Sequence, residues 1–156
     1  MKLKHVYLLF AFLCLLLIDQ ISKHIVRERI MPGEQLSLIG DLFKLTHIEN
    51  RGVAFSLMSE NYVFLLIIPN LLLLGLIIFL FIKKNLTHHL QISILFIVAG
   101  GTGNLIDRLA MGSVTDMFSL SFFPPVFNFA DICVVLGAVF ASIFILMDKA
   151  VIKKKN

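Results

Sequence analysis

The sequence has no tryptophan, only two cysteines and few charged side chains. Charged residues make up 15% of its 156 residues and hydrophobic residues 58%, whereas roughly 45–50% apolar residues are usual in a soluble domain. Two cysteines cannot build a disulfide framework, so we expect Cys14 and Cys133 to be buried free thiols. The five histidines lack metal-ligand spacing, and we predict no metal and no other cofactor. The composition favours an integral membrane protein.

Four apolar runs are long enough to cross a bilayer, at about residues 6–26, 63–82, 90–109 and 128–147. The first run resembles a signal peptide, but no small-residue cleavage motif follows it, so we expect it to remain as a helix. We therefore predict one membrane-embedded domain over residues 1–156, with an all-α integral membrane fold of four transmembrane helices.

The basic residues lie at the ends of the apolar runs and form no single patch, which argues against a nucleic-acid partner. The two terminal segments and residues 83–89 hold more than half of the 14 Lys and Arg residues. Because basic residues concentrate on the cytoplasmic side, both termini are predicted to be cytoplasmic. Residues 27–62 and 110–127 then form two outer loops.

The first outer loop is too long to be a simple connection. Its LSLI and LFKLTHI segments alternate apolar and polar residues and are bounded by Gly33 and Gly40, a pattern typical of short strands. We predict a small β-sheet at the outer membrane surface, formed from this loop.

The stretch Gly100–Asp131 concentrates polar side chains between the last two apolar runs. It contains Asn104, Asp107, Arg108, Asp116, Asn128 and Asp131. Ionisable groups at the edge of a bilayer are costly and call for a functional explanation. We predict that Asp116, from the loop after the third helix, and Asp131, in the first turn of the fourth, meet at one membrane level.

Two such carboxylates suit an aspartic-protease-like pair that shares one proton. The ionised partner acts as a general base on water, while the protonated one polarises the scissile carbonyl. Helix capping or an ion pair with Arg108 is the structural alternative for each single aspartate, and the role of Asp107 stays open.

Asp19 and Lys23 lie four residues apart and share a helix face. They form either an interfacial ion pair with a snorkelling lysine or a pair that orients something in the site, and the sequence favours neither. A small transporter is a second functional class. It is disfavoured because the predicted cytoplasmic halves of the helices lack ionisable residues, so no polar path crosses the membrane.

Five motifs occur in the order found in lipoprotein signal peptidase, the bacterial type II signal peptidase, and the chain resembles that family. They are DQISK (19–23), NRGVAFS (50–56), GGTGNLIDR (100–108), GSVTDMF (112–118) and FNFAD (127–131). The resemblance implies a membrane aspartyl endopeptidase of the bacterial cytoplasmic (inner) membrane, with its active site near the outer face. Such an enzyme removes signal peptides from prolipoproteins by cutting before a diacylglyceryl-modified cysteine.

The resemblance also assigns roles to residues and implies partners. Asp116 and Asp131 would be the catalytic pair, with Asp19 and Lys23 as supporting residues. The residues around the pair and the substrate would be Asn50, Gly52, Asn104, Arg108 and Asn128. Besides diacylated prolipoprotein substrates and membrane lipids, the expected ligand is the inhibitor globomycin. A monomer is expected.

Overall fold

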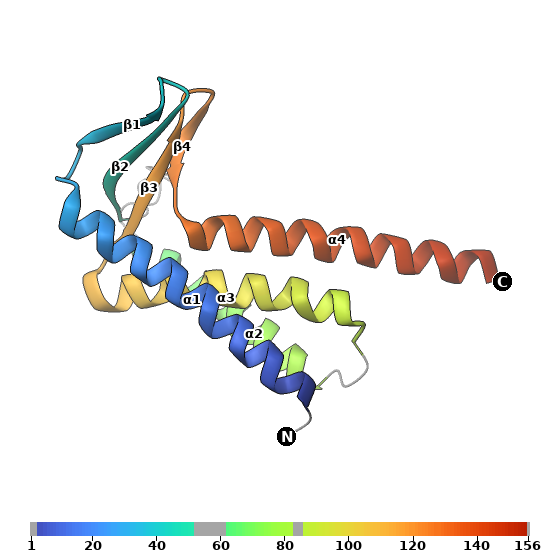
Figure 1. Ribbon diagram of the computed structural model, residues 1–156. Coiled ribbons are helices and arrows are strands. Elements are labelled where there is room, and N and C mark those ends of the chain that lie inside the picture. The colour runs from blue at the N-terminus through green and yellow to red at the C-terminus, as the bar shows by residue number, and fades with distance from the viewer. Residues whose placement is uncertain (1–2, 52–61, 83–85, 156) are drawn as a thin grey trace.

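The computed structural model describes residues 3–51, 62–82 and 86–155 (Figure 1). This part of the chain contains helices α1 (Leu3–Arg29), α2 (Tyr62–Ile82), α3 (His88–Met111) and α4 (Phe129–Lys155). Its strands are β1 (Gln35–Ile39), β2 (Phe43–Asn50), β3 (Val114–Leu120) and β4 (Phe123–Phe127). The prediction of a mostly helical chain with a small sheet is confirmed.

Within the described residues, three helical segments are long and apolar enough to cross a membrane: Val6–Arg29, His88–Met111 and Phe129–Met147. Helix α2 carries Pro69 in its interior, and Ile68–Phe79 is the apolar part of it whose side chains the structure describes. Well-defined caps bound α3. The Thr87 hydroxyl accepts a hydrogen bond from the Leu90 amide at its start, and Gly112, with φ of 72°, ends it in the left-handed conformation.

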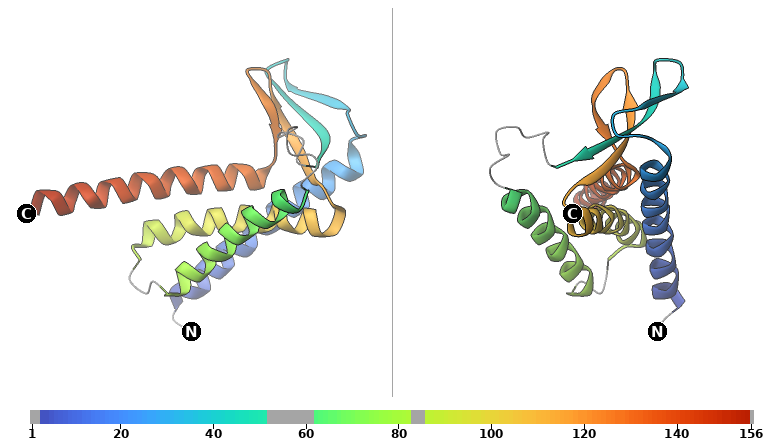
Figure 2. Two further views of the ribbon diagram at one scale, coloured as in Figure 1. Left: turned by 180° about the vertical axis from the view of Figure 1, so that it is seen from behind. Right: turned by 90° about the vertical axis from the view of Figure 1, so that its left-hand side faces the viewer.

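Helix α3 lies at the centre of the bundle and packs against each of the other three helices. The end-on view in Figure 2 shows α1 and α2 on opposite sides of it. Small residues allow the close approach of α3 to α4. A Cβ atom at Gly100 would collide with the carbonyl oxygen of Ala130, and one at Gly137 with that of Ser93.

The four strands form one antiparallel sheet in the order β1-β2-β3-β4 at one end of the helices (Figure 1). The predicted strands of the first outer loop are β1 and β2. The prediction that the sheet comes from that loop alone is wrong, because β3 and β4 come from residues 110–127. An aspartate in β3 and two prolines in β4 interrupt the alternation of apolar and polar residues that would predict strands. In addition, β3 is stabilised by pairing with β2, which is far away in the sequence.

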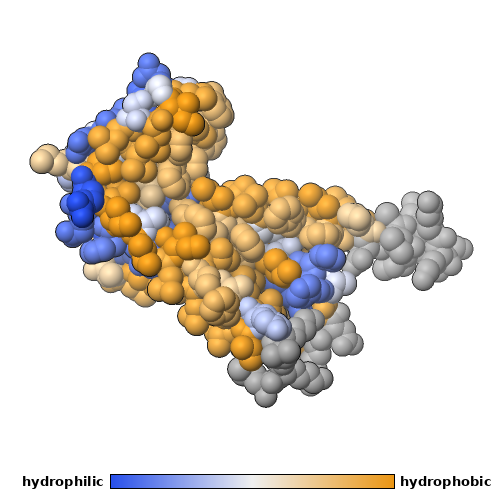
Figure 3. Space-filling view, in the orientation of Figure 1, coloured by the Kyte–Doolittle hydropathy of each residue, from blue (hydrophilic) through white to orange (hydrophobic). Residues whose placement is uncertain are grey.

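On the face shown in Figure 3, hydrophobic side chains cover most of the helices, and hydrophilic ones gather towards the two ends of the helical region. On α1, for example, Phe10 is 68% exposed and Leu17 57%. A soluble monomer rarely exposes apolar patches of this extent. The outward-facing side chains therefore suit contact with membrane lipid.

Candidate active site

Strand β3 and the start of α4 place Asp116 and Asp131 around one residue, Asn128. The Nδ2 of Asn128 donates to Asp116 Oδ1 at 2.7 Å, and its backbone N donates to Asp131 Oδ2 at 3.1 Å. Asp116 lies in a strand and not in a loop, which corrects the sequence prediction. The two carboxylates expected to meet are thus brought to a common hydrogen-bonding partner.

Asn128 and Asp131 also cap α4. The Asn128 backbone N donates to the Asp131 carboxylate, and in return the Asp131 backbone N donates to Asn128 Oδ1 at 3.0 Å. This reciprocal pattern is a capping box and satisfies backbone donors at the helix start. Since Asn128 Oδ1 accepts from the helix, its Nδ2 must face Asp116. The helix cap therefore orients the Asn128 side chain so that its Nδ2 donates to Asp116.

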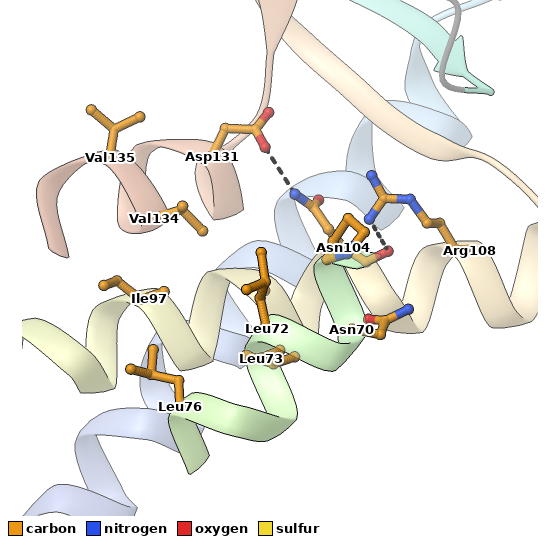
Figure 4. Close-up of a pocket in the computed structure, with 12 residues that line it drawn as sticks. Asn70, Leu72, Leu73, Leu76, Ile97, Asn104, Arg108, Asp131, Val134 and Val135 are labelled. Carbon is orange, nitrogen blue, oxygen red and sulfur yellow. Dashed lines mark hydrogen bonds between the residues drawn. The ribbon is translucent and has the colours of Figure 1, made fainter. Parts of the chain in front are cut away.

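Two further asparagines donate to the remaining carboxylate oxygens. Asn50 Nδ2 donates to Asp116 Oδ2 at 2.8 Å, and Asn104 Nδ2 donates to Asp131 Oδ1 at 2.8 Å (Figure 4). Asn50 pairs with Val114 across the β2–β3 ladder, so Asp116 is its diagonal neighbour on the same sheet face. Amide donors from three separate segments thus orient the carboxyl pair.

The environment of Asp116 favours its protonated form. Burial raises the pKa of Asp116 from its ordinary value of 3.8 to about 6, and the neighbouring Asp131 charge acts in the same direction. Hydrogen bonds from Asn50 and Asn128 partly oppose this rise. Asp116 can therefore hold a proton at a pH where an ordinary aspartate is ionised.

A cavity of about 530 Å³ opens beside Asp131 between α2, α3 and α4. Its polar end is formed by Asn104, Arg108 and Asp131, and Asn70 of α2 also lines it (Figure 4). Its apolar wall is formed by Leu72, Leu73, Leu76, Ile97, Val134 and Val135. The site combines an apolar channel with a carboxylate at one end.

Arg108 lies in this cavity and does not neutralise the carboxyl pair. Its Nη1 is 3.4 Å from the Asn104 carbonyl oxygen, to which it donates. Among residues 3–51, 62–82 and 86–155, no ion pair joins Arg108 to an acid. The sequence left open an ion pair between Arg108 and one of the aspartates. No such pair forms in the described part of the chain.

Lys23 is fully buried, so the interpretation of a snorkelling lysine is wrong. Its ammonium lies 2.9 Å from Asp19 Oδ2 and 3.0 Å from Asp107 Oδ2. The Arg27 guanidinium approaches Asp107 at 3.9 Å. Asp107, whose role the sequence left open, thus belongs to a buried ionic cluster, and its cationic partners come from α1.

A family model described as signal peptidase (SPase) II matches residues 11–147. The chain belongs to the signal peptidase II family. The lipoprotein signal peptidase of Clostridium tetani is 34% identical over 137 residues, covering 85% of this chain and 88% of that protein. The one from Fusobacterium nucleatum subsp. nucleatum is 39% identical over 134 residues, covering 84% and 81%. The resemblance seen in the sequence motifs is confirmed.

Two solved structures, both described as bacterial membrane enzymes, resemble this signal peptidase II family member along most of its length. One has a TM-score of 0.81 at 28% identity and covers 92% of this chain and 89% of its own. The other has a TM-score of 0.82 at 29% identity and covers 91% and 94%.

Not every predicted residue of this family member can be placed. Gly52, with most of the NRGVAFS motif, lies outside the described residues. Cys133 is buried and Cys14 is half-buried, and both are free. In the described ranges, no group of three or more His, Cys, Asp or Glu residues could hold a metal ion.

Sequence reasoning missed Gln20 and Thr115, which contact Asp107 and which no local pattern marks.

Proposed function

We propose that this signal peptidase II family member is an aspartic endopeptidase that removes signal peptides from prolipoproteins. The observation that carries the proposal is the carboxyl pair of Asp116 and Asp131, joined through Asn128, with Asp131 at the polar end of an apolar cavity. The cut falls before a cysteine that bears diacylglycerol. No metal or other cofactor takes part in the proposed reaction.

The proposed mechanism uses one ionised and one protonated aspartate. Burial makes Asp116 the carboxyl on which the shared proton rests. Asp131, which accepts from Asn104 and from its own capping box, then takes a proton from the attacking water. Asp116 donates its hydrogen bond to the scissile carbonyl as the tetrahedral oxyanion develops.

The cavity suits the substrate's chemistry. The apolar wall between α2 and α4 accommodates the apolar part of the signal peptide and the acyl chains beside it. Asn104 and Arg108 offer a polar end at which the scissile bond lies against Asp131. The cyclic peptide globomycin is proposed to occupy the same cavity and block access to the pair.

We place the chain in the bacterial cytoplasmic (inner) membrane as one domain over residues 1–156. In this proposal α2 also crosses, giving four spans and a monomeric enzyme. The start of α1 and the end of α4 lie away from the sheet (Figure 1), which supports having both termini in the cytoplasm. The sheet and the carboxyl pair lie at the opposite end, so the site is assigned to the outer face.

Incubation of the purified full chain with a diacylated prolipoprotein tests this proposal. The expected result is release of the signal peptide, with the new N-terminus at the modified cysteine, and suppression by globomycin. The matched control is the same prolipoprotein with the cysteine replaced by serine, which should stay uncut. Equal cleavage of both substrates would contradict the assigned specificity, and absence of cleavage would contradict the activity.

The pH dependence of kcat/KM provides an independent check on the pair. Because Asp116 has a pKa of about 6, the upper limb of a bell-shaped profile should lie near pH 6. Donation from Asn50 favours the ionised carboxylate, so Asn50→Ala should raise the pKa of Asp116 and move that limb to higher pH. A limb that moves to lower pH, or not at all, would contradict this arrangement.

A further inference from the structure

Lys23 lies at the centre of the buried ionic cluster, between Asp19 and Asp107. The Lys23 ammonium has three donors, and three acceptors surround it: Asp19 Oδ2 at 2.9 Å, Asp107 Oδ2 at 3.0 Å and Asn104 Oδ1 at 2.9 Å. Lys23 comes from α1 and its partners Asp107 and Asn104 from α3, so the cluster joins the two helices. Gln20 donates to the Asp19 and Asp107 carboxylates as well.

Each acid of the cluster holds the backbone immediately before one of the paired aspartates. The Ala130 amide N, which precedes Asp131, donates to Asp19 Oδ1 at 2.9 Å. The Thr115 amide N, which precedes Asp116, donates to Asp107 Oδ2 at 3.2 Å. The start of α4 and strand β3 are thus attached to two carboxylates that share one ammonium.

Lys23 also fixes the direction of the Asn104 amide. An ammonium only donates hydrogen bonds, so the oxygen of Asn104 must face Lys23 and its nitrogen must face Asp131. With the amide reversed, Asn104 would present its oxygen to a carboxylate. The donor to Asp131 is therefore set by a residue that does not contact Asp131.

Stability alone is a weak reason for such a cluster, because burying charges is costly and well-packed apolar residues often serve as well. We propose that Lys23 is a positioning residue that sets the mutual placement of the Asp116 and Asp131 carboxylates, through Asp107, Asp19 and Asn104. This inference rests on the proposed function, since it needs the two aspartates to act as a pair.

A charge-balanced double variant, Lys23→Met with Asp19→Asn, tests this role. It removes one charge of each sign and leaves the Asp107–Arg27 pair, while an asparagine at position 19 can still accept from the Ala130 amide. We expect kcat on a diacylated prolipoprotein to fall roughly 10- to 100-fold with little change in KM, because small misplacements of reacting groups have effects of this size.

The pH profile separates positioning from a loss of stability. The positive charge of Lys23 lowers the pKa of Asp116, so its removal should move the upper limb of kcat/KM to higher pH. The matched control is Ile94→Ala, at a buried apolar position outside the cavity, which should lower thermal stability but leave both limbs in place. Unfolding can be followed with a thiol-reactive fluorophore, since Cys133 is buried in the fold.

Wild-type kcat in the folded double variant would overturn the proposal, as would a kcat loss with an unmoved pH profile. If the double variant does not fold, Asp107→Asn tests the same link with little change of shape and should lower kcat at unchanged KM. Failure of the proposed function has a different signature. In that case either the wild-type chain would leave the prolipoprotein uncut, or Asp116→Asn and Asp131→Asn would themselves remain active.

Discussion

Replacement of either paired aspartate by asparagine is expected to lower the turnover of a diacylated prolipoprotein by about 10³- to 10⁴-fold, within the range of a lost general acid or base. An asparagine at position 131 can neither take a proton from water nor share one with Asp116. Its side-chain oxygen can still accept from the Asn128 amide, so the cap of α4 should survive. Single-turnover cleavage of Asp116→Asn and Asp131→Asn, with thermal unfolding measured in parallel, tests this prediction.

Two other aspartates serve as graded controls. Asp41 is 98% exposed, pairs with Lys44 and lies in the β1–β2 turn, so Asp41→Asn should cleave at the wild-type rate. Asp107→Asn weakens the ionic cluster and should have an intermediate effect, about tenfold, as expected for one weakened charged hydrogen bond. Near-normal turnover of either paired variant would refute the pair, and inactivation of Asp107→Asn to the same extent would move Asp107 into it.

The sequence predicted the helices and the polar start of α4 because those signals are local. An apolar run is recognisable without knowing its neighbours, and Asn128 and Asp131 lie three residues apart at a helix start. The sheet was only half predictable. β3 contains Asp116 and is stabilised by pairing with β2, more than sixty residues earlier, so the strand is set by a non-local contact.

The ionic cluster could not be predicted from the sequence. The spacing of Asp19 and Lys23 showed a shared helix face, but their partners depend on how α1 packs against α3. The same packing gives Asp107 its positive neighbours, Lys23 and Arg27. The sequence alone offered Asp107 only Arg108 as a nearby cation. The role of Asp107 therefore depends on the packing of α1 against α3, which the sequence does not show.

Asn128→Asp should separate the two functions of Asn128. Aspartate caps helices about as well as asparagine, so α4 should keep its start, although an ionised third carboxyl in this buried position lowers the thermal stability. The donor to Asp116 is lost, however, and a third carboxyl takes its place in a fully buried position. We expect a loss of about 10²- to 10³-fold in kcat, the size seen when one preorganised donor is removed from an active site.

The comparison with Asn128→Ala distinguishes charge from capping. Alanine removes the donor and the cap together, so the drop in its unfolding temperature should not depend on pH, whereas that of Asn128→Asp should shrink as the pH is lowered. Because the defect of Asn128→Asp comes from an added negative charge, its activity should partly recover as the pH is lowered and the new carboxyl is protonated. Alanine adds no titrating group and should show no such recovery. A parallel pH response of the two variants would mean that Asn128 acts through the helix cap alone.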